Sequence, residues 1–127
     1  MPETPITLII EDLPAPKPEQ VAKKITFQGQ LDESNIDENS KTIYNLIKQY
    51  PKNLFLLFEF SKLEYMNSKA IGYLTDWCEQ VSQGHGNIVI ANPMQNIREI
   101  LETVGITDMV KLYTSIDEAK SALFLNH

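Results

Sequence analysis

The residue with the strongest chemical signal is Ser68, because it stands where an apolar strand is predicted to give way to a helix. Serine is a preferred helix N-cap, since its hydroxyl accepts a hydrogen bond from a free backbone N–H of the first turn. A phosphate on the same hydroxyl would meet the positive end of the helix dipole and add a charge of roughly −1.5 to −2. The local pattern therefore allows a structural cap or a phosphorylation site, and by itself it favours the cap.

The other reactive side chains predict no catalytic site. His85 lies between two glycines in a predicted turn, and His127 is the terminal residue. Cys78 falls on a predicted helix, where a small buried hydrophobe is the usual role of a single cysteine. Asp76 and Glu79 have a spacing common on helix surfaces, and neither a glycine-rich phosphate loop nor metal-ligand spacing is present. We therefore expect neither enzyme activity nor a bound metal or cofactor.

The composition predicts one soluble domain over residues 1–127, with its core between residues 6 and 123: the chain is 43% hydrophobic and 22% charged. The acidic N-terminus, the lack of a long apolar run and the single cysteine argue against a signal peptide, membrane insertion and a disulfide framework. We therefore expect a cytoplasmic location. The net charge of −6, with Lys23-Lys24 as the only adjacent basic pair, argues against nucleic acid and for a protein partner.

Strand and helix patterns alternate along the chain, which predicts an α/β fold with a mixed, mostly parallel sheet of about four or five strands covered by about four helices. Strands are expected at residues 6–11, 24–31, 53–60, 87–91 and 109–113. The first helix is expected to begin near Ser34, with Asp37 completing a loose capping box, and to end before Pro51. Further helices are expected at residues 68–82 and 95–104 and after Ser115. Prolines predict an exposed surface loop over residues 12–22.

Four stretches of the sequence form a combined pattern. No single stretch is specific for a protein family, but the four together, in this order and spacing, are. Gly29-Gln30-Leu31-Asp32 is similar to a Gly-x-Leu-Asp motif at the end of a second strand. FEFSKLEYMNSKAIGYL is similar to an apolar strand that leads into Asp-Ser-Ser-Gly and a helix. NIVIANP is similar to a strand with an Asn-Pro turn, and residues 104–119 are similar to a C-terminal Gly-Leu and acidic helix-start pattern. Over residues 6–123 the chain resembles the STAS domain family, the fold of bacterial anti-sigma factor antagonists.

The resemblance implies a protein-interaction switch. In that family a partner that is both a kinase and an anti-sigma factor phosphorylates a serine after an aspartate, and phosphorylation releases the antagonist from this partner. The phosphoacceptor position falls on Ser68. Three neighbours depart from the motif: Asn67 replaces the aspartate, Lys69 the second serine and Ala70 the glycine. Asn67 keeps the capping capacity but loses the charge, Lys69 adds a cation, and Ala70 adds a methyl where glycine lets a partner's backbone approach.

The expected docking surface is the predicted turn with the start of the following helix. Its residues are Met66, Asn67, Ser68, Lys69 and Ile71, with Asn92 and Met94 as neighbours. For Met66 and Ile71 the alternative is that they close the core. A second reading of the whole chain is an adaptor subunit of a transporter or stress-signalling complex, in which Ser68 is not phosphorylated. The pattern predicts no oligomeric state.

Overall fold

The sheet consists of five strands in the order β1-β2-β3-β4-β5 in the computed structural model, which describes residues 5–125. The strands are β1 (Ile6–Leu13), β2 (Val21–Leu31), β3 (Leu54–Met66), β4 (Asn87–Ala91) and β5 (Lys111–Tyr113). The α-helices are α1 (Ile36–Gln49), α2 (Ser68–Gln83), α3 (Gln95–Thr103) and α4 (Ile116–Leu123), and a short 3₁₀ helix spans Ile106–Asp108. β1 and β2 are antiparallel, and every other neighbouring pair is parallel. The predicted mixed, mostly parallel α/β sheet is confirmed.

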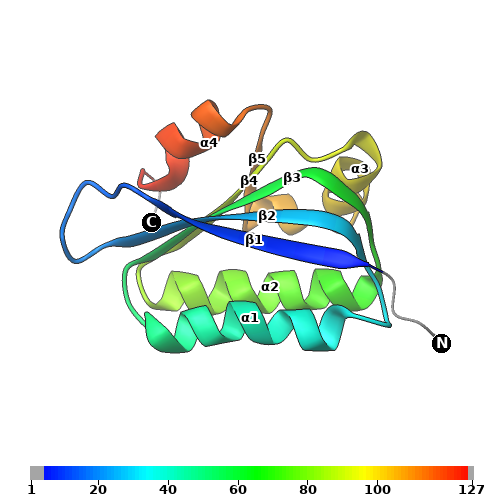
Figure 1. Cartoon of the computed structure of the whole chain (residues 1–127). Helices are drawn as coiled ribbons and strands as arrows, with labels where there is room; N and C mark the ends of the chain where they lie inside the picture. Colours follow the sequence, from blue (N-terminus) through cyan, green and yellow to red (C-terminus); the bar gives the residue numbers. More distant parts are fainter. Residues whose placement is uncertain (1–4, 126–127) are drawn as a thin grey trace.

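The sheet separates the hydrophobic core into two layers, and helices cover both of its faces. α1 and α2 lie side by side on one face of the sheet and α4 lies on the other (Figure 1). β3 is buried on both faces from Leu54 to Phe60, which explains its nearly continuous apolar sequence. Phe58 packs in the cluster that includes α1, α2 and α3, whereas Phe55 and Leu57 pack with Ala119 and Leu123 of α4.

The first two strands extend into the predicted surface loop, so its bounds at residues 12 and 22 were wrong. Leu13 pairs with Ala22 at the end of the β1–β2 ladder, which leaves residues 14–20 as the connection. In the sequence, charged residues close to prolines are typical of a loop, which is why these strand ends were assigned to it. In the structure Lys23 lies 2.5 Å from Asp12 across the ladder, so the two side chains form a cross-strand ion pair that supports the strands.

β3 also continues beyond its predicted end at Phe60. In its second half Leu63 and Met66 are buried and the residues between them are exposed, so every third residue faces the core where the register with β2 shifts. This half pairs with β2 as far as Met66 opposite Leu31, whereas β4 pairs only with residues 55–59 of β3. On the side that β4 leaves open, Asn96 of α3 donates a hydrogen bond to the Glu64 carbonyl at 3.0 Å. The long strand thus carries the chain past β4 to the start of α2.

Two smaller expectations were also wrong. The capping box of α1 does not form, because Ser34 binds Asp32 through both its amide and its hydroxyl, at 3.0 and 2.7 Å. The last strand begins at Lys111 rather than Met109, because the 3₁₀ helix at Ile106–Asp108 and the turn after it occupy that stretch. Ser115 does cap α4, accepting a hydrogen bond from the Glu118 amide at 3.0 Å.

Candidate functional site

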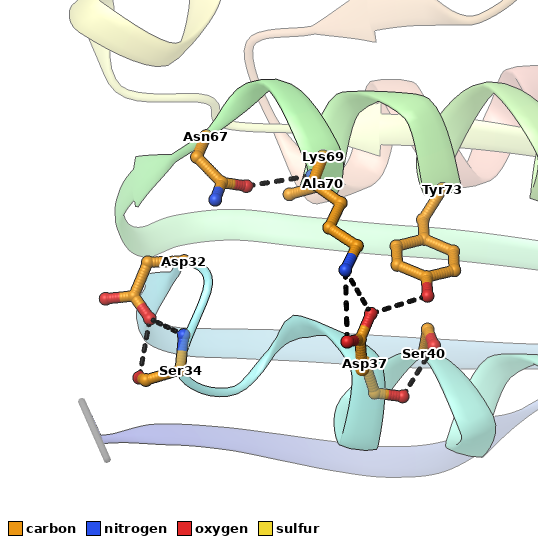
Figure 2. Close-up of polar contacts among 8 residues, drawn as sticks. All are labelled: Asp32, Ser34, Asp37, Ser40, Asn67, Lys69, Ala70 and Tyr73. Atoms are coloured by element: carbon orange, nitrogen blue, oxygen red, sulfur yellow. Dashed lines mark hydrogen bonds and ion pairs between the residues drawn. The ribbon is translucent and has the colours of Figure 1, made fainter. Parts of the chain in front are cut away.

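Asn67 connects the end of β3 to α2 and is the N-cap of that helix. Its backbone N–H donates to the Leu31 carbonyl at 3.1 Å. Its side-chain oxygen accepts from the Ala70 amide at 2.9 Å (Figure 2). Ser68 is the first residue of α2, exposed, and its hydroxyl has no hydrogen-bond partner among residues 5–125. The capping interpretation of Ser68 is therefore wrong, because the neighbouring amide side chain already fills that role.

Lys69 joins the start of α2 to the first turn of α1. Its Nζ lies 3.0 Å from both carboxylate oxygens of Asp37, and the Tyr73 hydroxyl donates to the same carboxylate at 2.7 Å (Figure 2). The hydrogen bond from Tyr73, followed by that from Lys69, holds the pKa of Asp37 below its usual value. The hydrogen bond to Asp37 in turn raises the pKa of Lys69. The cation beside Ser68 is thus already paired.

Two residues of the predicted turn face the core. Met66 is 2% exposed and Ala70 is fully buried, and both belong to the cluster beneath α1 and α2. Met66 therefore closes the core and offers no side-chain surface, which was the alternative for this position. The methyl of Ala70 lies within the core cluster rather than on the surface of the turn. Ile71 is half-buried and packs against the same cluster.

Asn92 and Met94 belong to a different part of the sheet. Asn92 follows β4, donates its amide N–H to the Tyr113 carbonyl at 2.8 Å and donates from its side chain to Glu59 at 2.9 Å. Glu59 is 5% exposed and its other oxygen accepts from the Ser61 amide, so this buried carboxylate is satisfied. Met94 is 37% exposed before α3. The hydrogen bonds of Asn92 go to β3 and β5, and none joins it to residues 66–71 among the described contacts.

A recess between α1 and α2 was missed by sequence reasoning. It has a volume of about 360 Å³ and is lined by Tyr44, Lys69, Gly72, Tyr73 and Asp76. Tyr44 donates a hydrogen bond to Asp76 although the two are 32 residues apart. No local signal joins such residues, because their contact depends on how the two helices pack.

The structure also places the other reactive groups that the sequence analysis considered, as far as they lie within residues 5–125. Burial, with a smaller effect of Glu79, raises the pKa of the Cys78 thiol to about 12. His85 is exposed in the turn before β4, and His127 lies outside the described residues. Within residues 5–125, no three His, Cys, Asp or Glu side chains group closely enough to hold a metal ion. No α-helix in the same range has the length and apolar character needed to span a membrane.

Comparison with known proteins establishes the family. The model of the STAS domain matches residues 13–119, and this chain therefore belongs to the STAS domain family. An anti-sigma factor antagonist from Mycobacterium paratuberculosis shares the fold, with a TM-score of 0.78 and 18% identity over 94% of each chain. The antagonist SpoIIAA in its unphosphorylated form is also similar, with a TM-score of 0.72 and 17% identity over 91% of this chain and 94% of that one.

The phosphorylated form of SpoIIAA from Bacillus has a TM-score of 0.65 and 18% identity over 91% of this chain and 97% of that one. Among curated proteins, the sequence has no significant match. At these identities the structural similarity describes the fold.

Proposed function

We propose that this chain is a cytoplasmic, single-domain interaction module of the anti-sigma factor antagonist type, which acts by binding rather than by catalysis. Its partner is a serine kinase that also serves as an anti-sigma factor. The observation that carries the proposal is the Ser68 hydroxyl, which is exposed at the start of α2 and forms no hydrogen bond with residues 5–125. A kinase can reach such a hydroxyl without unfolding the helix.

The surroundings of Ser68 also favour a large effect of phosphorylation on the electrostatics of the docking turn. A phosphate there would lie at the positive end of a 16-residue helix with no acidic residue in its first turn. Asn67 leaves the position before Ser68 uncharged, so it adds no repulsion to the dianion. The new charge would change the electrostatics of the docking turn more than the stability of the fold.

The first experiment is intact-mass and peptide mass spectrometry of the protein isolated from its native cells. We expect a phosphate on Ser68 in at least one growth or stress condition. An unmodified Ser68 in every condition would contradict the phosphorylation part of the proposal.

The second experiment measures binding to the copurifying kinase. Ser68→Asp and Ser68→Glu should weaken binding about tenfold or more, because they mimic part of the phosphate charge, whereas Ser68→Ala should not. Ser121→Asp makes the same charge change on the exposed surface of α4 and serves as the control. Equal binding by all four variants would rule out a switch at Ser68.

A second candidate function is the unphosphorylated STAS adaptor of a transporter or stress-signalling complex. The ion pair between Lys69 and Asp37 favours it, because the cation beside Ser68 is already paired with a carboxylate and is not free to receive a phosphate. Copurification separates the two candidates: a soluble ATP-binding kinase supports the first, and a transporter ATPase or a membrane complex supports the second.

A further inference from the structure

One face of α2 supplies most of the residues that line the recess between α1 and α2. Lys69, Gly72, Tyr73 and Asp76 follow each other at helical spacing, so their positions lie along the same side of the helix. Tyr44 of α1 forms the opposite wall. The recess begins at Lys69, one residue after Ser68 in the sequence.

Aromatic rings form the walls of this recess. The rings of Tyr44 and Tyr73 meet edge to face with centroids 6.1 Å apart, and Tyr73 stacks on buried Trp77 at 6.2 Å. Contacts of this kind hold the two tyrosine rings in place. Aromatic faces attract cations and stack on planar guanidinium groups.

The charges of the recess leave one carboxylate oxygen available. Lys69 is neutralised by both oxygens of Asp37. Asp76 accepts hydrogen bonds from Tyr44 and Gln80 through Oδ2 alone, and its Oδ1 has no partner among residues 5–125. Burial, and then the hydrogen bond to Asp76, raises the pKa of Tyr44, so this hydroxyl keeps its proton and donates it to the hydrogen bond.

Gly72 keeps the floor of the recess open. It is exposed in the first half of α2, and a Cβ added there would meet nothing within 4 Å. Glycine inside a helix destabilises the fold by about 0.5–1 kcal/mol relative to alanine. No packing within the described chain requires this glycine, whereas the close approach of another molecule would.

We propose that this recess binds an arginine side chain of the partner protein. The guanidinium donates to Oδ1 of Asp76 and lies against the rings of Tyr44 and Tyr73, while the partner's backbone passes over Gly72. Arginine fits better than lysine because its planar group both stacks on rings and donates to carboxylates in a fixed geometry. The net charge of −6 also favours binding of a positively charged segment of the partner.

This inference deepens the proposed function, on which it rests, by naming the chemistry of the partner's contact. The geometry of the recess does not depend on modification of Ser68. The two proposals can therefore fail separately: mass spectrometry of Ser68 tests the switch, and binding of an arginine probe to the unmodified chain tests the recess.

The test is an NMR titration of the isotope-labelled full chain with two alanine-based helical peptides of equal length. One peptide carries a single central arginine and the other carries citrulline, which has nearly the same shape without the charge. We expect saturable shift changes at the Gly72 and Tyr73 amides and the Tyr44 ring with the arginine peptide, and about tenfold weaker binding of the citrulline peptide. Equal affinity of the two peptides, or no binding, would overturn the proposal.

Two variants and a matched control locate the contact. Asp76→Asn removes the charge but keeps an acceptor for Tyr44, and it should weaken arginine binding about tenfold. Glu79→Gln makes the same charge change on an exposed residue of α2 outside the recess, and it should leave the affinity unchanged. Gly72→Ala should raise the Tm and still weaken binding. If Asp76→Asn and Glu79→Gln lowered the affinity for the arginine peptide equally, general charge attraction would explain the binding. That result would overturn the assigned site.

Discussion

At the scale of single residues, the start of α2 depends on an amide side chain. Asn67 caps the helix through the Ala70 amide at 2.9 Å, while Ser68 makes no hydrogen bond within residues 5–125. We expect Asn67→Ala to lower the free energy of unfolding by about 1 kcal/mol and Ser68→Ala to change it by less than about 0.5 kcal/mol. Asn67→Asp should keep the cap and add a favourable charge at the helix N-terminus. Urea denaturation of the three variants measures these differences, and a larger loss for Ser68→Ala would contradict the assignment of the cap.

The carboxylate of Asp37 reports the contact between α1 and α2. Its pKa is held low by Tyr73 first and Lys69 second, with smaller contributions from Lys41. Because the folded pKa lies below the ordinary value of about 3.9, the contribution of this network is present above that pH and is lost as the pH falls through the folded pKa. We expect Tyr73→Phe and Lys69→Gln each to raise the Asp37 pKa more than Lys41→Gln does, because both side chains bind the carboxylate directly. An NMR titration of the carboxyl carbon measures the order, and a reversed order would contradict it.

The location of Ser68 was predictable from the sequence, but its environment was not. An apolar strand followed by small polar residues correctly indicated an exposed helix start. Asn67 and Ser68 are both good caps, so only the structure shows which side chain turns toward the Ala70 amide. Likewise, Met66 is apolar at the end of a strand, and its burial depends on the pairing of β3 with β2.

At the scale of the elements, two glycines should respond to alanine in opposite directions. A Cβ at Gly86, before β4, would overlap the carbonyl of Leu54, whereas a Cβ at Gly72 in α2 would meet open space. We expect Gly86→Ala to destabilise the fold by about 1–3 kcal/mol and Gly72→Ala to stabilise it by about 0.5–1 kcal/mol. Thermal denaturation of both variants measures the signs, and equal shifts in one direction would contradict the packing around Gly86.

Buried central elements were the most predictable. The strand at residues 87–91 was predicted with its observed bounds, because a short apolar run lies between Gly86 and Asn92. The ends of β1 and β2 were missed, because Lys23 and Asp12 indicate solvent exposure and only their pairing across the ladder reveals a strand. Edge strands are half-exposed, so their sequences carry less of the hydrophobic pattern that identifies buried strands.

At the scale of the whole molecule, Cys78 should react only when the fold opens. Burial raises its pKa to about 12, so the thiolate fraction at pH 8 is roughly 10⁻⁴. We expect iodoacetamide to modify the native chain at pH 8 far more slowly than the urea-unfolded chain, at a rate that rises with the unfolded population. Mass spectrometry after timed quenching measures both rates. Rapid modification in native buffer would show that α2 opens locally without global unfolding.

The α1–α2 recess belongs to the same scale, because no segment of the chain contains it. Tyr44 and Asp76 meet only after both helices have packed on one face of the sheet. The sequence predicted each helix and its apolar side, but it carried no information about the side chains that line the boundary between them. Surfaces that form between elements therefore require the structure.

The second half of β3 has a consequence for self-association. β4 ends opposite Glu59, so within residues 5–125 the β3 backbone beyond that point has no neighbouring strand on this side. Unpaired strand edges are templates on which other chains add strands, the first step toward amyloid-like stacking. Here the Asn96 side chain occupies the Glu64 carbonyl, and Lys62 and Glu64 expose charged groups along the same stretch. The N-terminal turn of α3 and these charges thus guard the edge of β3 that β4 leaves open, while β2 still pairs with the other edge as far as Met66.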